Sequence, residues 1–161
     1  MNEFWFSFWE KLDLQQFVPL AAAIFLGGLI GLEREIHHKP AGLRTNTLIC
    51  LGAALLTMIA RSTAAGDNST RIIQGIITGV GFIGAGAIMR DQANIYGVTT
   101  AATIWIVTVI GIACGYELYR MAIFTAVLSL LVLLGLGPLD RKIRKDEDIE
   151  APDTKGKGSV D

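Results

Sequence analysis

The strongest constraint in this sequence of 161 residues is a set of five stretches that contain no Asp, Glu, Lys or Arg. Each stretch is between 16 and 25 residues long, and they cover residues 14–32, 45–60, 72–89, 92–116 and 121–139. A helix that crosses a bilayer needs about 17–25 mostly apolar residues. One such stretch could be a buried core helix, but five of them leave no polar shell that could surround them. The pattern excludes a soluble enzyme and predicts an all-α, polytopic membrane helix bundle.

We expect about five transmembrane helices within a membrane domain over residues 17–139. The predicted spans are residues 17–33, 44–60, 72–90, 98–116 and 120–138. Residues 1–16 place aromatic side chains at helical spacing among charged ones, which predicts an amphipathic segment in the headgroup layer. Residues 140–161 hold 13 of the 29 charged side chains and little apolar content. They therefore predict a charged, disordered cytoplasmic tail.

The distribution of Lys and Arg predicts how the chain is oriented, because cytoplasmic loops are enriched in these residues. With the N-terminus outside, ten of the 14 basic residues fall in cytoplasmic segments and four in outer segments. Two of the ten lie far from the last span, and leaving them out still gives eight against four. The sequence therefore predicts an N-out, C-in, multi-pass protein.

Glycines are concentrated in the first and third predicted spans. Gly79, Gly81 and Gly84 spell G-x-G-x-x-G, but a dinucleotide site also needs a preceding strand and an acidic residue about 20 positions on. Position 99 is a threonine, so we interpret the glycines as positions where helix backbones approach each other closely. The predicted helix-packing glycines are Gly27, Gly31, Gly75, Gly79, Gly81, Gly84 and Gly86, and Gly111 and Gly115 share the same four-residue spacing. A break in the third span at these glycines stays open.

Charged side chains flank the two predicted cytoplasmic loops, with a few polar residues just inside the neighbouring spans. We identify a functional polar cluster made up of Glu33, Arg34, Glu35, Arg44, Asn46, Arg90, Asp91, Thr99 and Thr100. One interpretation is a self-neutralising ion network that fixes the helix ends. The other is a polar cytoplasmic pocket or docking face. In either case we expect Arg44 to pair with one of the acids of the cluster.

No pattern in the sequence indicates catalysis, a metal site or a cofactor. His37 and His38 are adjacent and cannot share a helix face, and Cys50 and Cys114 lie in apolar stretches, as buried hydrophobic residues do. The net charge of −1 comes without a basic patch, so no nucleic-acid partner is expected. We predict a protein that is not an enzyme, with no catalytic residues, no bound metal and no cofactor. No carboxylate lies near the middle of a span, which disfavours a Mg²⁺ carrier with a midplane acidic site.

Three stretches of the sequence resemble the MgtC/SapB family of bacterial inner-membrane proteins. The first reads GxxIGxERE and runs from Gly27 to Glu35. The second reads AGLRTNxLxxLGAA, from Ala41 to Ala54. The third reads GxGFIGAGxIxR followed by GxTTAAxxW, from Gly79 to Trp105. The resemblance covers residues 27–105, and the remaining predicted spans agree with it in number and spacing.

The resemblance implies a multi-pass protein of the bacterial inner membrane that is linked to magnesium limitation, acid stress and intracellular survival. It implies regulation of membrane protein partners, ATP synthase among them, as the way in which the protein acts in magnesium and ion homeostasis. Transport of Mg²⁺ or another solute is the alternative, and a structural subunit of a membrane complex is a third reading. The lipid bilayer is an expected partner, and a homo-oligomer stays open. Longer members carry a soluble regulatory C-terminal domain, so this sequence resembles the short form.

Overall fold

The computed structural model describes residues 14–63, 67–91 and 94–150. Residues 1–13 and 151–161, with most of the predicted amphipathic segment and half of the predicted tail, lie outside the described residues. The elements in chain order are a 3-10 helix η1 (Leu14–Phe17), α2 (Val18–Ile36), α3 (Leu43–Thr63), α4 (Asp67–Gly86), strands β1 (Met89–Asp91) and β2 (Asn94–Tyr96), α5 (Val98–Gly115) and α6 (Tyr119–Glu150). The predicted all-α class is confirmed.

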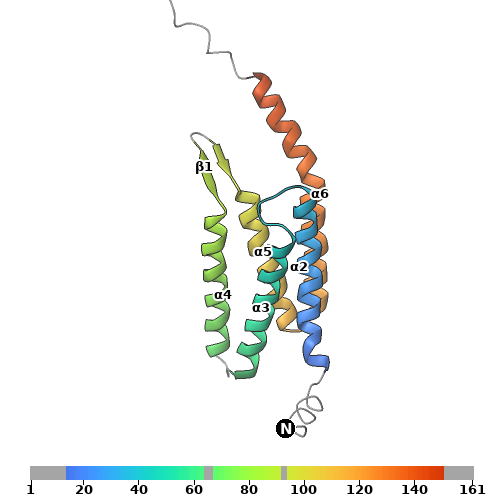
Figure 1. Cartoon of the computed structure of the whole chain (residues 1–161), viewed down its shortest axis with the longest axis vertical. Coiled ribbons are helices and arrows are strands. Elements are labelled where there is room, and N and C mark those ends of the chain that lie inside the picture. Colours follow the sequence, from blue (N-terminus) through green and yellow to red (C-terminus); the bar gives the residue numbers. More distant parts are fainter. Residues whose placement is uncertain (1–13, 64–66, 92–93, 151–161) are drawn as a thin grey trace, which may run out of the picture. The chain divides into compact units, whose positions relative to one another are not determined.

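The chain divides into two compact units between Ser129 and Leu130. In the first unit, α3 packs against α2, α4 and α5, and α5 also packs against α2 and α4 (Figure 1). The loop between α2 and α3 and the hairpin of β1 and β2 lie at the same end of this bundle. The loop end is therefore the place where the predicted polar cluster can assemble.

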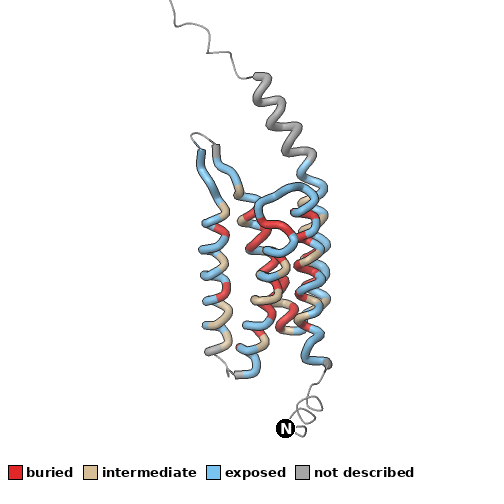
Figure 2. Tube along the Cα trace, in the orientation of Figure 1, coloured by how far each residue is buried: buried red, intermediate tan, exposed pale blue. Residues whose placement is uncertain are grey.

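The interior of the first unit consists mainly of small side chains. The buried row of α3 recurs at helical spacing and comprises Asn46, Cys50, Ala53, Ala54, Thr57 and Ala60. It faces the buried glycines and alanines of α2 and the threonine- and glycine-containing face of α5. Figure 2 shows buried residues gathered on these three helices, whereas most of α4 is exposed. Close helix packing, rather than bulky hydrophobic side chains, holds this core together.

Large apolar side chains point outward, as expected for a protein whose solvent is lipid. Phe25, Leu48, Phe82 and Phe124 are each at least 65% exposed, which a soluble monomer rarely tolerates over a wide surface. Four helices in the described part of the chain are long and apolar enough to cross a membrane, namely Gln15–Ile36, Leu43–Ser62, Val98–Gly115 and Tyr119–Gly137. These helices support a polytopic membrane protein.

The α4 helix is 20 residues long but is less apolar than those four, because it includes Arg71, Gln74 and five glycines. It is continuous to Gly86, and the chain then enters the hairpin, whose register pairs Met89 with Tyr96 and Arg90 with Ile95. The predicted third span of residues 72–90 therefore extends too far. In the sequence, the signal for the hairpin is two short groups of apolar residues, residues 88–89 and 95–96, with mostly polar residues between them.

Three other helices run beyond their predicted ends, and α3 does so by three residues, to Thr63. Pro19 lies in the first turn of α2, as its missing N–H group favours, and α2 continues to Ile36, so the first acidic residues of the polar cluster belong to its last turn. The α6 helix continues to Glu150, although a disordered tail was expected from residue 140. Opposite charges recur four residues apart in this segment, as in Asp140 and Arg144, and this spacing favours a helix.

Candidate functional site

The buried face of α2 ends in two charged residues. Apolar residues and glycines make up this face for most of its length, and Glu33 and Arg34 follow them in the last turns of α2. These two side chains are only 7% and 4% exposed. Glu33 Oε2 lies 2.5 Å from Arg34 Nε, and Glu33 Oε1 lies 2.8 Å from Arg34 Nη2. Two parallel N–H···O bonds of this kind form a strong charge-assisted pair. Each charge is therefore compensated where water cannot solvate it.

His37 adds a third member to this ion pair, and we name Glu33, Arg34 and His37 the Glu33 network. His37 Nδ1 lies 2.8 Å from the backbone oxygen of Glu33 and 3.1 Å from its Oε1 atom. The imidazole is 39% exposed, so the network reaches the surface through this residue. Sequence reasoning considered His37 only together with His38 and missed this role. The four-residue spacing from Glu33 was the available signal.

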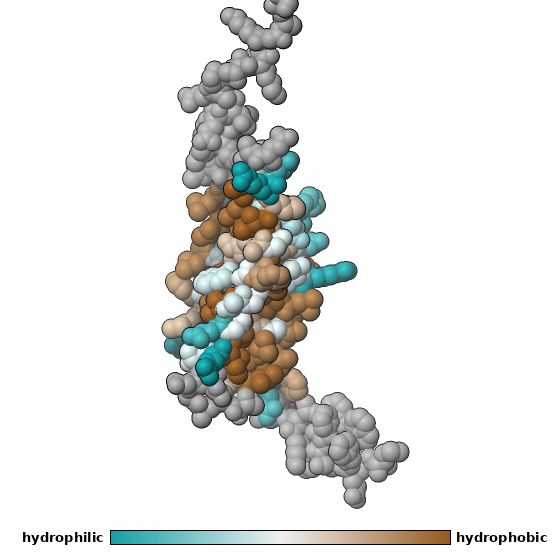
Figure 3. Space-filling model, turned by 90° about the vertical axis from the view of Figure 1, so that its left-hand side faces the viewer, coloured by the Kyte–Doolittle hydropathy of each residue, from teal (hydrophilic) through white to brown (hydrophobic). Residues whose placement is uncertain are grey.

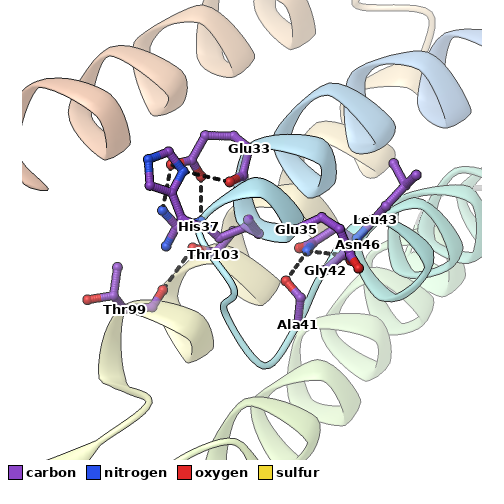
Figure 4. A network of polar contacts seen from close by, with 10 residues as sticks. Glu33, Glu35, His37, Ala41, Gly42, Leu43, Asn46, Thr99 and Thr103 are labelled. Atoms are coloured by element: carbon purple, nitrogen blue, oxygen red, sulfur yellow. Dashed lines mark hydrogen bonds and ion pairs between the residues drawn. The ribbon is translucent and has the colours of Figure 1, made fainter.

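A second set of contacts closes the loop between α2 and α3, and we name it the loop clamp. The backbone N–H of Leu43 donates to Glu35 Oε2 at 3.0 Å. Asn46 Nδ2 donates to the carbonyl oxygens of Ala41 and Gly42, both at 2.8 Å (Figure 4). The carboxylate of α2 thus caps the N-terminus of α3, where a negative charge is favourable.

Gly42 and Asn46 occupy tightly defined positions in the loop clamp. A Cβ atom on Gly42 would collide with the carboxylate of Glu35, so the clamp requires a glycine there. The Asn46 side chain is fully buried, and its Oδ1 atom has no hydrogen-bond partner among the described residues. These contacts give a physical reason for the ERE and AGLRTN motifs, because they bring both motifs together.

The remaining members of the predicted polar cluster lie apart from these contacts. Arg44 is exposed on the first turn of α3, and Arg90 and Asp91 are exposed on β1 rather than at a helix end. Thr100 is buried, and the exposed Thr99 accepts the hydroxyl hydrogen bond of Thr103 at 2.8 Å through its backbone oxygen. The cluster thus shares one end of the bundle without forming a single network.

The expected pairing of Arg44 with an acid does not occur in the described part of the chain. Glu33 is bound by Arg34 and His37, Glu35 is bound by the Leu43 N–H, and no ion pair joins Arg44 to either acid or to Asp91. Glu33 and Glu35 have partners that are nearer in the chain, in the last turn of α2 and at the start of α3. Neither carboxylate therefore needs Arg44 as a partner.

The predicted helix-packing glycines divide into three groups, according to what a Cβ atom at each would meet. A Cβ on Gly27 would lie 2.5 Å from Cys50 Cβ, and one on Gly31 would lie 2.8 Å from Leu43 Cα, so both lie tightly against α3. Gly84 has only ordinary contacts with Ala101. At Gly75, Gly79, Gly81 and Gly86 a Cβ would meet nothing within 4 Å. Close packing inside this chain therefore explains the glycines of α2 but not those four of α4.

Gly97 was missed as a structural requirement. It precedes α5 with a φ of 87°, and a Cβ there would collide with the carbonyl oxygen of Ala87. The conformation and the contact both require glycine where the hairpin returns to the bundle.

The described residues contain no group of three or more His, Cys, Asp or Glu side chains arranged to hold a metal ion. Cys50 and Cys114 are free and buried. At this end of the bundle the buried side chains of the Glu33 network and the loop clamp are hydrogen-bonded or ion-paired, apart from Asn46 Oδ1, and the charges of Arg44 and Asp91 are exposed.

Comparison with known proteins places the chain in a family. The family model described as "MgtC family" matches residues 20–142. "Protein MgtC" of Brucella abortus (strain 2308) is 45% identical over 121 residues, which cover 74% of this chain and 50% of that protein. "Protein MgtC" of Salmonella typhimurium (strain 14028s / SGSC 2262) is 42% identical over 111 residues, covering 69% and 48%. No solved structure matches. The chain spans about half the length of these relatives, and it belongs to the MgtC family.

Proposed function

We propose that this protein acts in the bacterial inner membrane, in magnesium and ion homeostasis and stress adaptation, by regulating membrane protein partners rather than by catalysis. The proposal takes its setting from the MgtC family and from the names of the relatives. The resemblance in sequence adds ATP synthase as one partner to test.

The observation that carries this proposal is the occupied carboxylate of Glu33. Mg²⁺ is bound through oxygen ligands that usually include one or two carboxylates. Glu33 is the buried acid of the described residues, and both of its oxygens are bound by Arg34. A cation would have to displace a buried guanidinium to reach it. This arrangement supports a regulator over a Mg²⁺ carrier.

The loop end of the bundle is the face that we propose for partner contact. Arg44 exposes its charge there on α3, beside the loop clamp, and Asp91 exposes its charge on β1 of the hairpin at the same end. Exposed charges favour specific and rapid docking of a protein with complementary charges. The partner is captured by this face and not converted chemically.

Two measurements test the proposed function. The purified protein, reconstituted in liposomes with a Mg²⁺-sensitive dye inside, should give no flux above protein-free liposomes. Asp91→Asn should reduce cross-linking of ATP synthase subunits in membranes, whereas Arg120→Gln, an exposed charge in the first turn of α6, should not. Robust flux that is lost in Glu33→Gln would contradict the proposal and favour a transporter.

A further inference from the structure

An apolar groove of about 530 Å³ runs between α3 and α4. Leu48, Gly52 and Leu56 line it from α3, and Gly75, Gly79 and Ile83 are among the residues that line it from α4. Every lining residue is apolar or glycine. Figure 3 views the bundle from the side of α4 and shows pale, nearly neutral residues among the brown apolar ones. In a bilayer, such a groove is filled by something apolar.

The three glycines keep the groove open. A Cβ on Gly52, Gly75 or Gly79 would meet nothing within 4 Å, whereas Gly27 and Gly31 leave no such room because α3 lies against them. Glycine within a helix costs about 0.5–1 kcal/mol relative to alanine. The open glycines therefore make room for an occupant that does not belong to the described part of the chain.

The dimensions of the groove favour a thin occupant. Residues 72–83 of α4 line it over about 17 Å at 1.5 Å per residue. A helix that spans a bilayer is about 10–12 Å across and about 30 Å long. The groove is therefore shorter than a spanning helix, and it matches a single hydrocarbon chain better than a whole helix.

The positively charged side chain of Arg44 lies toward one end of the groove. Arg44 precedes Leu48 by four residues, so it lies in the same row of α3 as Leu48, Gly52 and Leu56. Its side chain is exposed and has no hydrogen bond or ion pair with the described residues. The first N–H groups of a helix lack intrahelical acceptors, and only that of Leu43 is taken up by Glu35. An anionic group can bind there.

Arg71 lies at the opposite end, four residues before Gly75 in α4. There the first turn of α4 is held to α3, because Ser69 Oγ donates to the carbonyl oxygen of Ala60 at 3.0 Å. Binding of an anion by Arg44 and binding by Arg71 are therefore two arrangements that substitution of each arginine distinguishes.

We propose that the groove is a phospholipid site, with an acyl chain lying between α3 and α4 and the phosphate bound by Arg44. The apolar lining recognises the chain, and the guanidinium recognises the phosphate. The site shares Arg44 with the face proposed for partner contact, but its tests involve no partner protein. It accounts for Gly75 and Gly79, two of the four open glycines of α4, and for an arginine that has no acidic partner among the described residues.

Native mass spectrometry of the full chain, extracted in mild detergent, tests the site. The wild-type protein should retain phospholipid, and Gly52→Leu and Gly79→Leu should lose it, because a leucine side chain would occupy the groove while its Cβ meets no protein atom within 4 Å. Gly81→Leu is the matched control, since Gly81 is equally open but does not line the groove. The control should retain phospholipid as the wild type does.

The charged end is tested by adding back lipid to delipidated protein. Wild-type protein should bind phosphatidylglycerol at least tenfold more tightly than diacylglycerol with the same acyl chains, and Arg44→Gln should lose that preference. This exposed substitution also keeps the test decisive if a leucine variant fails to fold. Unchanged lipid retention in both leucine variants would overturn the proposal. So would loss of the preference in Arg71→Gln instead, or a lipid-free dimer that the leucine variants dissociate.

Discussion

Two arginines at the loop end of the bundle lie in opposite environments. Arg34 is 4% exposed and binds both carboxylate oxygens of Glu33, whereas Arg44 is exposed and has no acidic partner among the described residues. Removing one member of a buried ion pair costs about 3–5 kcal/mol, because the other charge stays buried and unpaired. An exposed charge without a partner contributes little.

We therefore predict that Arg34→Gln lowers the free energy of unfolding by about 3–5 kcal/mol, and that Arg44→Gln changes it by less than about 1 kcal/mol. Unfolding in mixed detergent micelles, with delipidated protein so that bound lipid does not contribute, measures both. Equal destabilisation by the two substitutions would show that Arg44 has a buried partner.

Gly42 and Glu35 form the other residue pair that can be tested. Gly42→Ala would push the Glu35 carboxylate away from the N-terminus of α3, and losing such a cap costs about 0.5–2 kcal/mol. With Glu35→Ala already present, the methyl group has no carboxylate to displace. We predict that Gly42→Ala costs less in that background, with a coupling energy of about 0.5–3 kcal/mol. A double-mutant cycle of unfolding free energies for Gly42→Ala and Glu35→Ala measures this coupling energy. If the effects of the two substitutions simply add, the contact between Gly42 and the Glu35 carboxylate does not contribute as described.

At the residue scale, the sequence indicated where charged and amide side chains gather but not which of their atoms meet. The ERE and AGLRTN motifs stand out because charged and amide side chains are rare in apolar stretches, and the structure brings the two motifs into contact. The bond from Leu43 N–H to Glu35 could not be foreseen, since it depends on the direction in which α3 leaves the loop. The pair of Glu33 with its neighbour Arg34 was equally hidden, because adjacent helix positions do not normally face each other.

At the scale of elements, the positions of the helices could be predicted from the sequence, but how closely the helices pack against one another could not. The predicted spans located α2, α3, α5 and the start of α6 to within three residues, because the period and length of apolar stretches are strong signals. The glycine spacing was the same in α2, α4 and α5, yet only α2 and α5 lie close against α3. The four-residue spacing of glycines identifies a helix face that another helix can approach closely. Whether a helix does pack there depends on which elements the fold places beside that face.

This difference gives a prediction about glycines. A Cβ on Gly31 or Gly111 would meet backbone atoms of α3, so Gly31→Ala and Gly111→Ala should each destabilise the bundle by about 1–3 kcal/mol through overpacking. Gly81→Ala meets nothing, and it should be neutral or stabilising by up to about 1 kcal/mol, because alanine favours the helix. Thermal unfolding of the three variants in one detergent provides the comparison. Destabilisation by Gly81→Ala would show that α4 is closely packed after all.

At the scale of the whole molecule, the number of crossings depends on α4. Among the described residues, α4 is the one long helix that is not among the four helices apolar enough to cross a membrane. With four crossings, both ends of the chain would lie on one side of the membrane. At 20 residues α4 is about 30 Å long, which matches the hydrocarbon core. It also packs along α3 and α5, both of which are long and apolar enough to cross. Packing along two spanning helices compensates for its lower hydropathy, so α4 should cross as well.

Five crossings predict that the two ends of the chain lie on opposite sides of the membrane. Ten of the 14 basic residues then fall on the side of the C-terminus, which identifies that side as the cytoplasm. A reporter fused after residue 145 should therefore be active in the cytoplasm, and one inserted at residue 65, between α3 and α4, should be active in the periplasm. A third reporter at the N-terminus should also report the periplasm and serves as the internal check. Cytoplasmic signals from the reporters at both termini would contradict the five-crossing topology and would mean that α4 lies along the membrane surface.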